Sequence, residues 1–283
     1  MAYNQPYQHD KIFVFDIETI PDTEAVKSLT GFESEDTHEL RDELTRYHTE
    51  KTGNPFPRQM FHRIVAISYV VADIIRDSNG ESYVLRDVRS GGTLDSSEKH
   101  LVESFFNFMN KSKPRLVSYN GRTFDVPVLK YRAMKFGIQA TALYKTGTKW
   151  DSYNSRYSAD WHCDLLDTLS DYGASTRAKL DEVCSILGFP GKFGVDGSKV
   201  TEMFDNGQLK EIRDYCETDV INTYLVYLRS QLMNANMTKE NYNKAILDMK
   251  DFLQNSDSVE HAPFHEFLAA WQDANDGEFT LED

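Results

Sequence analysis

The spacing of hydrophobic side chains changes along the chain, and each change marks an expected element. Residues 11–20 form a β-branched and aromatic run that stops at Pro21-Asp22, which is typical of a buried strand entering a turn. Elsewhere, hydrophobic residues three and four positions apart predict helices. The predicted strands cover residues 11–20, 63–74, 81–89 and 115–119, and the predicted helices cover residues 98–111, 126–136, 179–188, 198–206 and 209–234.

Three regions are harder to assign from the spacing of hydrophobic residues. Residues 22–62 are polar and acidic and are interpreted as a loop or short-helix excursion over the surface. Residues 138–176 mix aromatic and polar side chains without a clear period. Beyond residue 235, two apolar helical stripes either pack on the core, which is favoured, or face a partner. The succession predicts a mixed α/β sheet flanked by helices, with a C-terminal helical extension.

Composition narrows the class of protein. Hydrophobic residues at 40% and charged residues at 27% are ordinary for a soluble globular chain, and no stretch approaches the roughly 18 apolar residues of a membrane span. The first residues lack a signal-peptide pattern, so a cytoplasmic location without a membrane partner is expected. Cys163, Cys184 and Cys216 are too few and too scattered for a disulfide framework or a zinc-binding pair, and we expect them in the core.

The formal net charge of −14 argues at first against a nucleic-acid ligand, because phosphate binding normally leaves a basic footprint. The charge is unevenly distributed. Residues 251–283 contain nine acidic residues and no Lys or Arg, so residues 1–250 carry a balance of only −5. Divalent cations bound to carboxylates would offset most of that remainder. The acidity therefore leaves a nucleic-acid substrate open.

The first candidate motif is Asp16-Ile-Glu18. The two carboxylates lie two residues apart in an apolar strand, so they project from the same face. Isolated ionised carboxylates are very costly to bury, and a divalent cation would satisfy both. Taken alone, the motif fits an exposed acidic end of an edge strand equally well.

Two further motifs carry a carboxylate each. Residues 120–125, Asn-Gly-Arg-Thr-Phe-Asp, join a strand to a helix and place Asp125 at or beside the helix N-terminus, where simple capping also explains it. Strand ends followed by helix starts are nevertheless where ligands collect in α/β sheets. Tyr215 and Asp219 are one turn apart in a predicted helix and share a face. In isolation they fit an ordinary contact pair.

Together the motifs read D-x-E, N-G-x-x-F-D and Y-x-x-x-D. This order resembles the three exonuclease motifs of the DEDD superfamily of 3′-to-5′ exonucleases, in the tyrosine-bearing DEDDy branch. The likeness extends over about residues 10–233 and is similar to a bacterial stand-alone exonuclease family related to the proofreading domain of family-B DNA polymerases. Its segments are 15–22, 61–71, 149–169, 179–200 and 213–229.

The resemblance implies a ribonuclease H-like fold with a five-stranded mixed sheet. It places a 3′-5′ exonuclease domain at residues 10–234 and a helical acidic C-terminal extension at residues 235–283. No polymerase palm or fingers segment fits into the remaining 50 or so residues. The implied activity is hydrolysis of phosphodiester bonds at the 3′ end of single-stranded DNA or of a frayed end.

Such hydrolysis is well served by two divalent ions, and Mg²⁺ or Mn²⁺ prefers oxygen ligands. The resemblance implies that Asp16 bridges two ions. Glu18 and Asp219 would bind the ion on the water side, and Asp125 would hold the other through water. An unperturbed tyrosine pKa near 10 makes Tyr215 better suited to orienting the water than to acting as a base.

Substrate contacts are expected at the same motifs and in one aromatic segment. Asn120 and Phe124 match positions near the terminal nucleotide, although packing also explains Phe124. Residues 144–161 interleave aromatic and basic side chains, among them Trp150 and Arg156, which suits stacking on unpaired bases or, equally, a folded aromatic loop. Asp164 and Asp167 also fit the family's pattern, with no role assigned to them.

Two alternatives stay open. A ribonuclease of the same fold would trim RNA 3′ ends, since only contacts to the 2′ position distinguish the sugars. A catalytically silent module, of a different class, would use the acidic C-terminal segment to dock a protein partner. A transposase or integrase core of related fold is disfavoured because the Y-x-x-x-D helix would not follow its carboxylates.

Overall fold

The computed structural model describes residues 9–192, 197–257 and 262–282. Its centre is one five-stranded sheet in the order β3-β2-β1-β4-β5. β1 pairs antiparallel with β2 and parallel with β4, β2 pairs antiparallel with β3, and β4 pairs parallel with β5. This is the mixed sheet of the ribonuclease H-like fold, as expected. The strands are β1 (Lys11–Pro21), β2 (His62–Asp77), β3 (Gly80–Ser90), β4 (Arg115–Ser118) and β5 (His162–Asp164).

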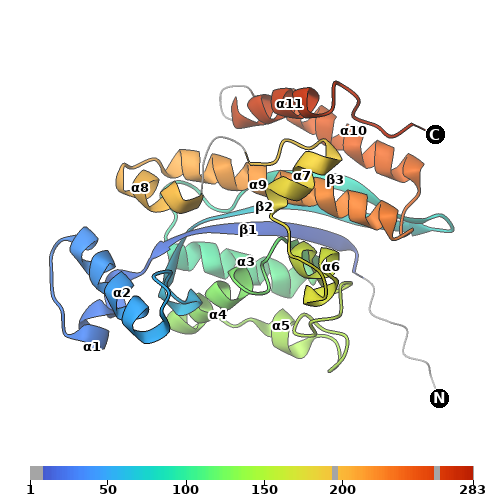
Figure 1. Ribbon diagram of the computed structural model, residues 1–283. Coiled ribbons are helices and arrows are strands. Elements are labelled where there is room, and N and C mark those ends of the chain that lie inside the picture. The colour runs from blue at the N-terminus through green and yellow to red at the C-terminus, as the bar shows by residue number, and fades with distance from the viewer. Residues whose placement is uncertain (1–8, 193–196, 258–261, 283) are drawn as a thin grey trace, which may run out of the picture.

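Helices cover both faces of the sheet (Figure 1). The long helix α9 crosses one face, with α7, α8, α10 and α11 beside it, whereas α3 and α4 lie on the other face. α1 and α2 project beyond the end of β1. The helices are α1 (Val26–Thr30), α2 (Thr37–Thr52), α3 (Glu98–Ser112), α4 (Asp125–Phe136), α5 (Thr141–Lys145), α6 (Leu165–Leu169), α7 (Leu180–Leu187), α8 (Val200–Asp205), α9 (Leu209–Met233), α10 (Lys239–Asn255) and α11 (Ala262–Ala274), with 3-10 turns at Thr23–Ala25, Gln59–Phe61, Asp171–Gly173 and Gly197–Lys199.

The side chains of β1 point alternately into two hydrophobic clusters, one on each face of the sheet. Phe13 and Phe15 pack into the cluster formed with α3 and α4, whereas Ile12 and Val14 pack into the cluster formed with α9. Because side chains alternate with a period of two, Asp16 continues the α9 side of the strand. The strand thereby delivers its carboxylates to the face that the longest helix covers.

The polar segment before β2 contains a longer helix than the sequence indicated. α2 has 16 residues, begins after Asp36, whose carboxylate accepts from the His38 N–H at 2.8 Å, and ends at Gly53 with a left-handed φ of 74°. It buries only Leu44 and His48, so its apolar stripe is too narrow to dominate a sequence pattern. Its mostly polar and charged surface therefore gave it a loop-like appearance in the sequence.

The C-terminal helices pack on the core. Buried residues of α10 and α11 belong to the same cluster as Val14 and the α9 side chains, which include Tyr224. Tyr242, Phe267 and Trp271 are almost completely buried in it. No described helix is long and apolar enough to cross a membrane.

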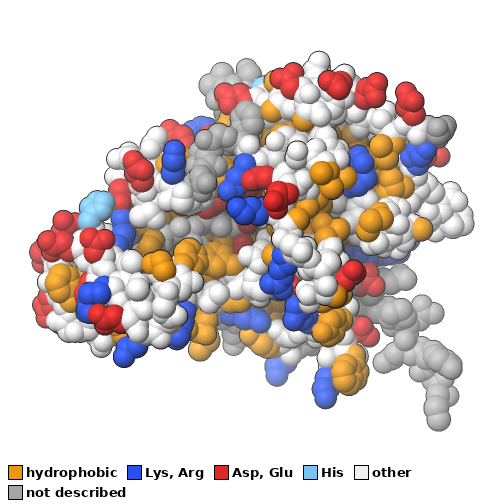
Figure 2. All heavy atoms as spheres, in the orientation of Figure 1, with side chains coloured by type: hydrophobic (Ala, Val, Ile, Leu, Met, Phe, Trp, Pro, Cys, Tyr) orange, Lys and Arg blue, Asp and Glu red, His pale blue; other side chains and the backbone are white. Residues whose placement is uncertain are grey.

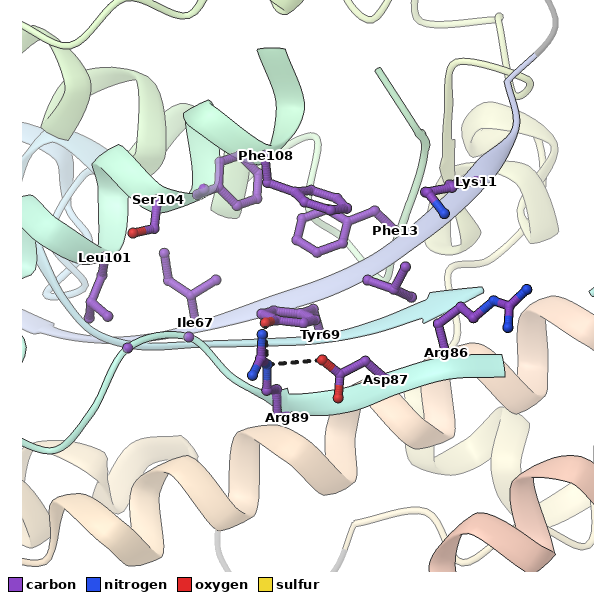
Figure 3. A pocket seen from close by; sticks show the side chains of 14 residues that line it. Lys11, Phe13, Ile67, Tyr69, Arg86, Asp87, Arg89, Leu101, Ser104 and Phe108 are labelled. Carbon is purple, nitrogen blue, oxygen red and sulfur yellow. Dashed lines mark hydrogen bonds and ion pairs between the residues drawn. The ribbon is translucent and has the colours of Figure 1, made fainter. Parts of the chain in front are cut away.

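An apolar groove of about 510 Å³ lies between α3 and strands β2 and β3 (Figure 3). Phe13 and Phe108 line it, and Lys11, Arg86 and Arg89 stand at its edges. Phe13 belongs to the α3 side of the sheet. The groove is therefore on the opposite face from the side chains that β1 directs toward α9.

Candidate active site

β1 carries two carboxylates toward α9. Asp16 is half-buried, and Glu18 is 9% exposed. The register between β1 and β2 shifts directly after Glu18, where the partner changes from Ala66 to Ile64. Such bulges re-aim side chains and are frequent beside active sites. The β-bulge therefore lies directly beside the two carboxylates of β1.

α9 supplies the facing side chains. The Cys216 thiol donates to the backbone oxygen of Asp16 at 3.6 Å and lies 3.8 Å from its Oδ2. Potential ligand atoms of Asp16, Glu18 and Cys216 lie within 4.8 Å of one another. Tyr215 and Asp219 stand on the same helix, and the Tyr215 side chain is 6% exposed. Helical periodicity had predicted the Tyr215–Asp219 face but not the approach of Cys216 to Asp16.

The loop before α4 brings in the fourth carboxylate. Asp125 is 4% exposed, and its Oδ1 accepts from the Ile17 N–H at 3.1 Å. The N-cap residue is Phe124, which makes no side-chain capping bond, so capping does not account for Asp125. A Cβ on Gly121 would approach Ser118 Oγ to 2.4 Å, which only glycine avoids. The tight loop thus presses Asp125 against β1 between Asp16 and Glu18.

These carboxylates act on one another electrostatically. Burial raises the pKa of Asp16 well above its usual range, and the charges of Asp125, Glu18 and Asp219 raise it further. Burial and the charges of Asp219 and Asp125 raise the pKa of Glu18 in the same way, against the charge of Lys192. The four groups therefore form one cluster.

The pKa values of Asp125 and Asp219 are raised less. Burial raises the pKa of Asp125 to about 7, although hydrogen bonds from backbone N–H groups oppose the rise. Burial likewise raises the pKa of Asp219 to about 6, against a hydrogen bond from Tyr215. Burial and nearby negative charge raise the pKa of Tyr215 far above its usual value. In the metal-free protein Tyr215 is therefore a neutral phenol.

The cluster fits hard divalent cations. Among the described residues, none donates a hydrogen bond to the buried Oδ1 of Asp219. Buried charges normally require pairing or metal coordination, and Mg²⁺ and Mn²⁺ take carboxylate oxygens as ligands. Asp16, Glu18, Asp125 and Asp219 would hold such ions. Cys216 is a soft donor that already donates to Asp16, so it is the poorest candidate ligand of the group.

The residues predicted to contact substrate divide into two groups. Asn120 has a left-handed φ of 70° and Phe124 packs edge-on against His62, so both lie in the loop that ends at Asp125. Trp150 is 74% exposed. Arg156 pairs with Asp167 at 3.1 Å. Within the described residues, no hydrogen bond or ion pair joins Trp150 or Arg156 to Asp16, Glu18, Asp125 or Asp219.

Sequence reasoning left Asp164 without a role, and the structure supplies one. Its Oδ1 accepts from the Asn120 N–H at 2.9 Å, and its Oδ2 accepts from the Arg122 N–H at 2.8 Å. Its Oδ1 also caps α6 through the Leu166 N–H. Asp164 therefore braces the loop that positions Asp125. The only signal in the sequence was its place in the family pattern.

Phe56 lies beside this loop, although nothing in the sequence selected it as a candidate. It is 57% exposed, and its ring centroid lies 5.9 Å from that of Phe124 and 5.0 Å from that of His62. Gln59 Nε2 donates to the Thr123 oxygen at 3.0 Å, which ties this segment to the loop before Asp125. In the sequence, Phe56 belonged to residues 22–62, which were interpreted as a loop or short-helix excursion.

One family model matches most of the chain. Residues 54–271 match the model of a family described as "Predicted 3'-5' exonuclease related to the exonuclease domain of PolB". Asp125, Tyr215 and Asp219 fall inside the match, and Asp16 and Glu18 precede it. Comparison with curated proteins finds no match.

Among solved structures, the chain is similar to the family B DNA polymerase from the hyperthermophilic archaeon Pyrobaculum calidifontis, at 18% identity and a TM-score of 0.47. The similarity covers 85% of this chain and 29% of the polymerase chain. The family match itself spans well over half of the 283 residues. The chain therefore belongs to the family of predicted 3′-5′ exonucleases related to the exonuclease domain of PolB.

Proposed function

We propose that this chain is a DEDDy-type exonuclease that uses divalent metal ions to release nucleoside monophosphates from the 3′ end of single-stranded DNA. The observation that carries the proposal is the convergence of four carboxylates from three segments, whose mutual charges raise their pKa values. Such clustering is unfavourable without cations, and perturbed groups of this kind gather at functional sites.

In the proposed reaction, a water oxygen forms a bond to the terminal phosphorus, and the bond from phosphorus to the preceding 3′ oxygen breaks. The departing oxygen takes a proton and becomes the new 3′ hydroxyl. When bound, two divalent ions supply the charge neutralisation and water activation that this step requires. Asp16, Glu18, Asp125 and Asp219 hold the ions in this proposal.

Tyr215 orients the attacking water through its hydroxyl. Its neutral phenol and its hydrogen bonding to Asp219 support this role rather than proton abstraction. The loop residues Asn120 and Phe124, with Phe56 beside them, are suited to contact the terminal nucleotide. Aromatic stacking on an unpaired base favours a frayed or single-stranded end over a paired one.

The test is digestion of a 5′-labelled single-stranded DNA 20-mer with Mg²⁺ or Mn²⁺. The expected result is a ladder shortened from the 3′ end that EDTA abolishes. Asp219→Asn should remove the activity, whereas the matched control Asp214→Asn should keep it. Asp214 lies on the same helix and pairs with Lys210 at 2.7 Å, away from the cluster.

The same experiment decides between the alternatives. Faster digestion of an RNA 20-mer than of DNA would overturn DNA as the substrate. No metal-stimulated release from either polymer would favour a silent binding module. A protein partner for the acidic C-terminal extension, residues 235–283, remains a separate proposal that this assay does not address.

A further inference from the structure

A surface beside the proposed site combines exposed aromatic rings with lysines that form no ion pair with any described carboxylate. We define this aromatic-basic surface by Lys130 of α4, Tyr144 and Lys145 of α5, and Lys149, Trp150 and Tyr157 of the loop that follows. Building on the proposed function, we propose that it binds the single-stranded part of the substrate on the 5′ side of the scissile end. The catalytic cluster would then act on a strand anchored outside it.

Charge distinguishes this part of the chain from the rest. Residues 126–158 contain six Lys or Arg and one acidic residue, Asp151, in a chain of net charge −14. Three of the six pair with acidic groups: Arg132 and Lys135 with carboxylates near α1 and α3, and Arg156 with Asp167. Among the described residues, no carboxylate pairs with Lys145 or Lys149, and both are exposed. Unpaired cations on an acidic protein are suited to bind phosphates.

The aromatic rings are unusually accessible. Tyr144 is 59% exposed, Trp150 is 74% exposed and Tyr157 is 71% exposed. Two of them lie beside a cation: Lys149 Nζ is 5.0 Å from the Trp150 ring centroid, and Lys130 Nζ is 5.5 Å from that of Tyr144. Figure 2 shows basic and hydrophobic side chains gathered at the lower right, over α5 and the following loop. Rings with adjacent cations are the platforms on which unpaired bases stack.

The loop that carries Trp150 is held in place. Thr148 donates its N–H to the Asp151 oxygen at 2.7 Å, and Ser158 Oγ donates to the Trp150 oxygen at 2.7 Å. A Cβ on Gly147 would approach the Asp151 oxygen to 2.1 Å, and φ there is 83°. The backbone is therefore fixed by its own hydrogen bonds while the indole remains exposed. Preorganised rings lose little entropy when a ligand binds.

The surface is connected to the loop that ends at Asp125. Arg122, within that loop, donates to the Tyr153 oxygen at 3.2 Å and to the Ser155 oxygen at 3.1 Å. Lys130, in the second turn of α4, donates to Asn154 Oδ1 at 3.1 Å. The helix that begins with Asp125 thus leads directly to the aromatic-basic surface. A strand whose 3′ end lies at the carboxylates would follow this loop and helix to reach it.

The binding test uses fluorescein-labelled dT12, with Ca²⁺ in place of Mg²⁺ and with salt varied. For Lys145→Ala/Lys149→Ala, the slope of log K against log salt should become shallower by about 1.4, since each phosphate contact on a single strand contributes about 0.7. Trp150→Ala should weaken binding roughly 5- to 150-fold. The matched controls, Lys99→Ala/Lys111→Ala on α3 and Phe32→Ala before α2, should bind like the unmodified chain.

A small substrate separates strand binding from a general structural effect. The p-nitrophenyl ester of thymidine 5′-monophosphate occupies only the carboxylates and the position of the terminal nucleotide, so Trp150→Ala should hydrolyse it normally while losing activity on dT12. Equal losses on both substrates would overturn the proposal, as would surface variants that bind dT12 with the unmodified slope. Equally tight binding of a twelve-residue polyglutamate would also overturn it, in favour of an acidic protein partner. An unmodified chain that hydrolyses neither substrate would instead refute the proposed function.

Discussion

The Asp125 carboxylate accepts a hydrogen bond from the Ile17 N–H at 3.1 Å, which ties the first residue of α4 to the strand between Asp16 and Glu18. Two segments more than a hundred residues apart are thereby held at one point. The bond also fixes the direction in which the remaining oxygen of Asp125 faces the other carboxylates. A substitution that keeps this acceptor oxygen therefore distinguishes the role of Asp125 in holding the loop from the role of its negative charge.

Asp125→Asn should leave the fold intact and lower turnover at saturating Mg²⁺ by about 100-fold or more, the loss typical of one removed transition-state contact. The amide oxygen can still accept from Ile17, whereas the negative charge is lost. Thermal unfolding and the rate of release of the 3′ nucleotide measure the two effects. Activity close to that of the unmodified chain would exclude Asp125 from metal binding.

Tyr215→Phe should lower turnover far less than Asp16→Ala, by about 10- to 100-fold against more than about 1,000-fold. The hydroxyl only orients water, whereas Asp16 carries charge at the centre of the cluster. Steady-state assays at saturating Mg²⁺ compare the two variants. Equal losses would show that the phenol participates in proton transfer or in metal binding.

Asp164→Ala should destabilise the fold by roughly 2–4 kcal/mol, because the Asn120 and Arg122 N–H groups would lose their acceptor. Asp164→Asn, which keeps an acceptor oxygen, should cost less. Urea unfolding measures both, and Asp95→Ala at an exposed position before α3 is a control. A stable Asp164→Ala variant with normal activity would show that the loop needs no brace.

Stability of the metal-free protein should fall as pH rises. The pKa values of Asp125, about 7, and Asp219, about 6, lie above the unfolded value of about 3.9. The folded state therefore binds more protons between about pH 4 and pH 7, so their stabilising contribution is present below this window and is lost through it. Thermal unfolding in EDTA from pH 5 to pH 8 measures the effect.

Mg²⁺ should reverse that loss at pH 8. At 100 times its Kd, an ion that binds only the folded state adds about 2.7 kcal/mol, and each kcal/mol raises Tm by about 2–4 °C in a chain of this size. At pH 4, where protons compete for the same oxygens, the rise should be much smaller. Asp219→Asn should flatten both dependences. An equal effect of Mg²⁺ at both pH values would contradict a carboxylate site.

The sequence predicted most of the long elements, although not α2, because their hydrophobic spacing is local. The period of two on β1 predicted that Asp16 and Glu18 share a face, and helical spacing predicted the Tyr215–Asp219 pair. β5 was not located, because three residues, His162–Asp164, are too few to show a period. The fifth strand was expected only from the family resemblance.

Contacts between distant segments had no local signal. Asp164 accepts from N–H groups more than forty residues away, and the Phe56 ring lies 5.9 Å from the Phe124 ring in a distant segment. The approach of Cys216 to Asp16 depends on how α9 crosses β1. Such pairings depend on tertiary packing, which the spacing of residues along one segment does not encode.

The central claim is that Asp16, Glu18, Asp125 and Asp219 form one divalent-metal site, and anomalous diffraction from crystals soaked in Mn²⁺ tests it most directly. The account predicts two manganese peaks at this cluster, with oxygens of Asp16, Glu18 and Asp219 as ligands at about 2.0–2.2 Å and none at Cys216. Crystals without manganese there, in which the carboxylates are paired with Lys192 or other cations, would contradict it.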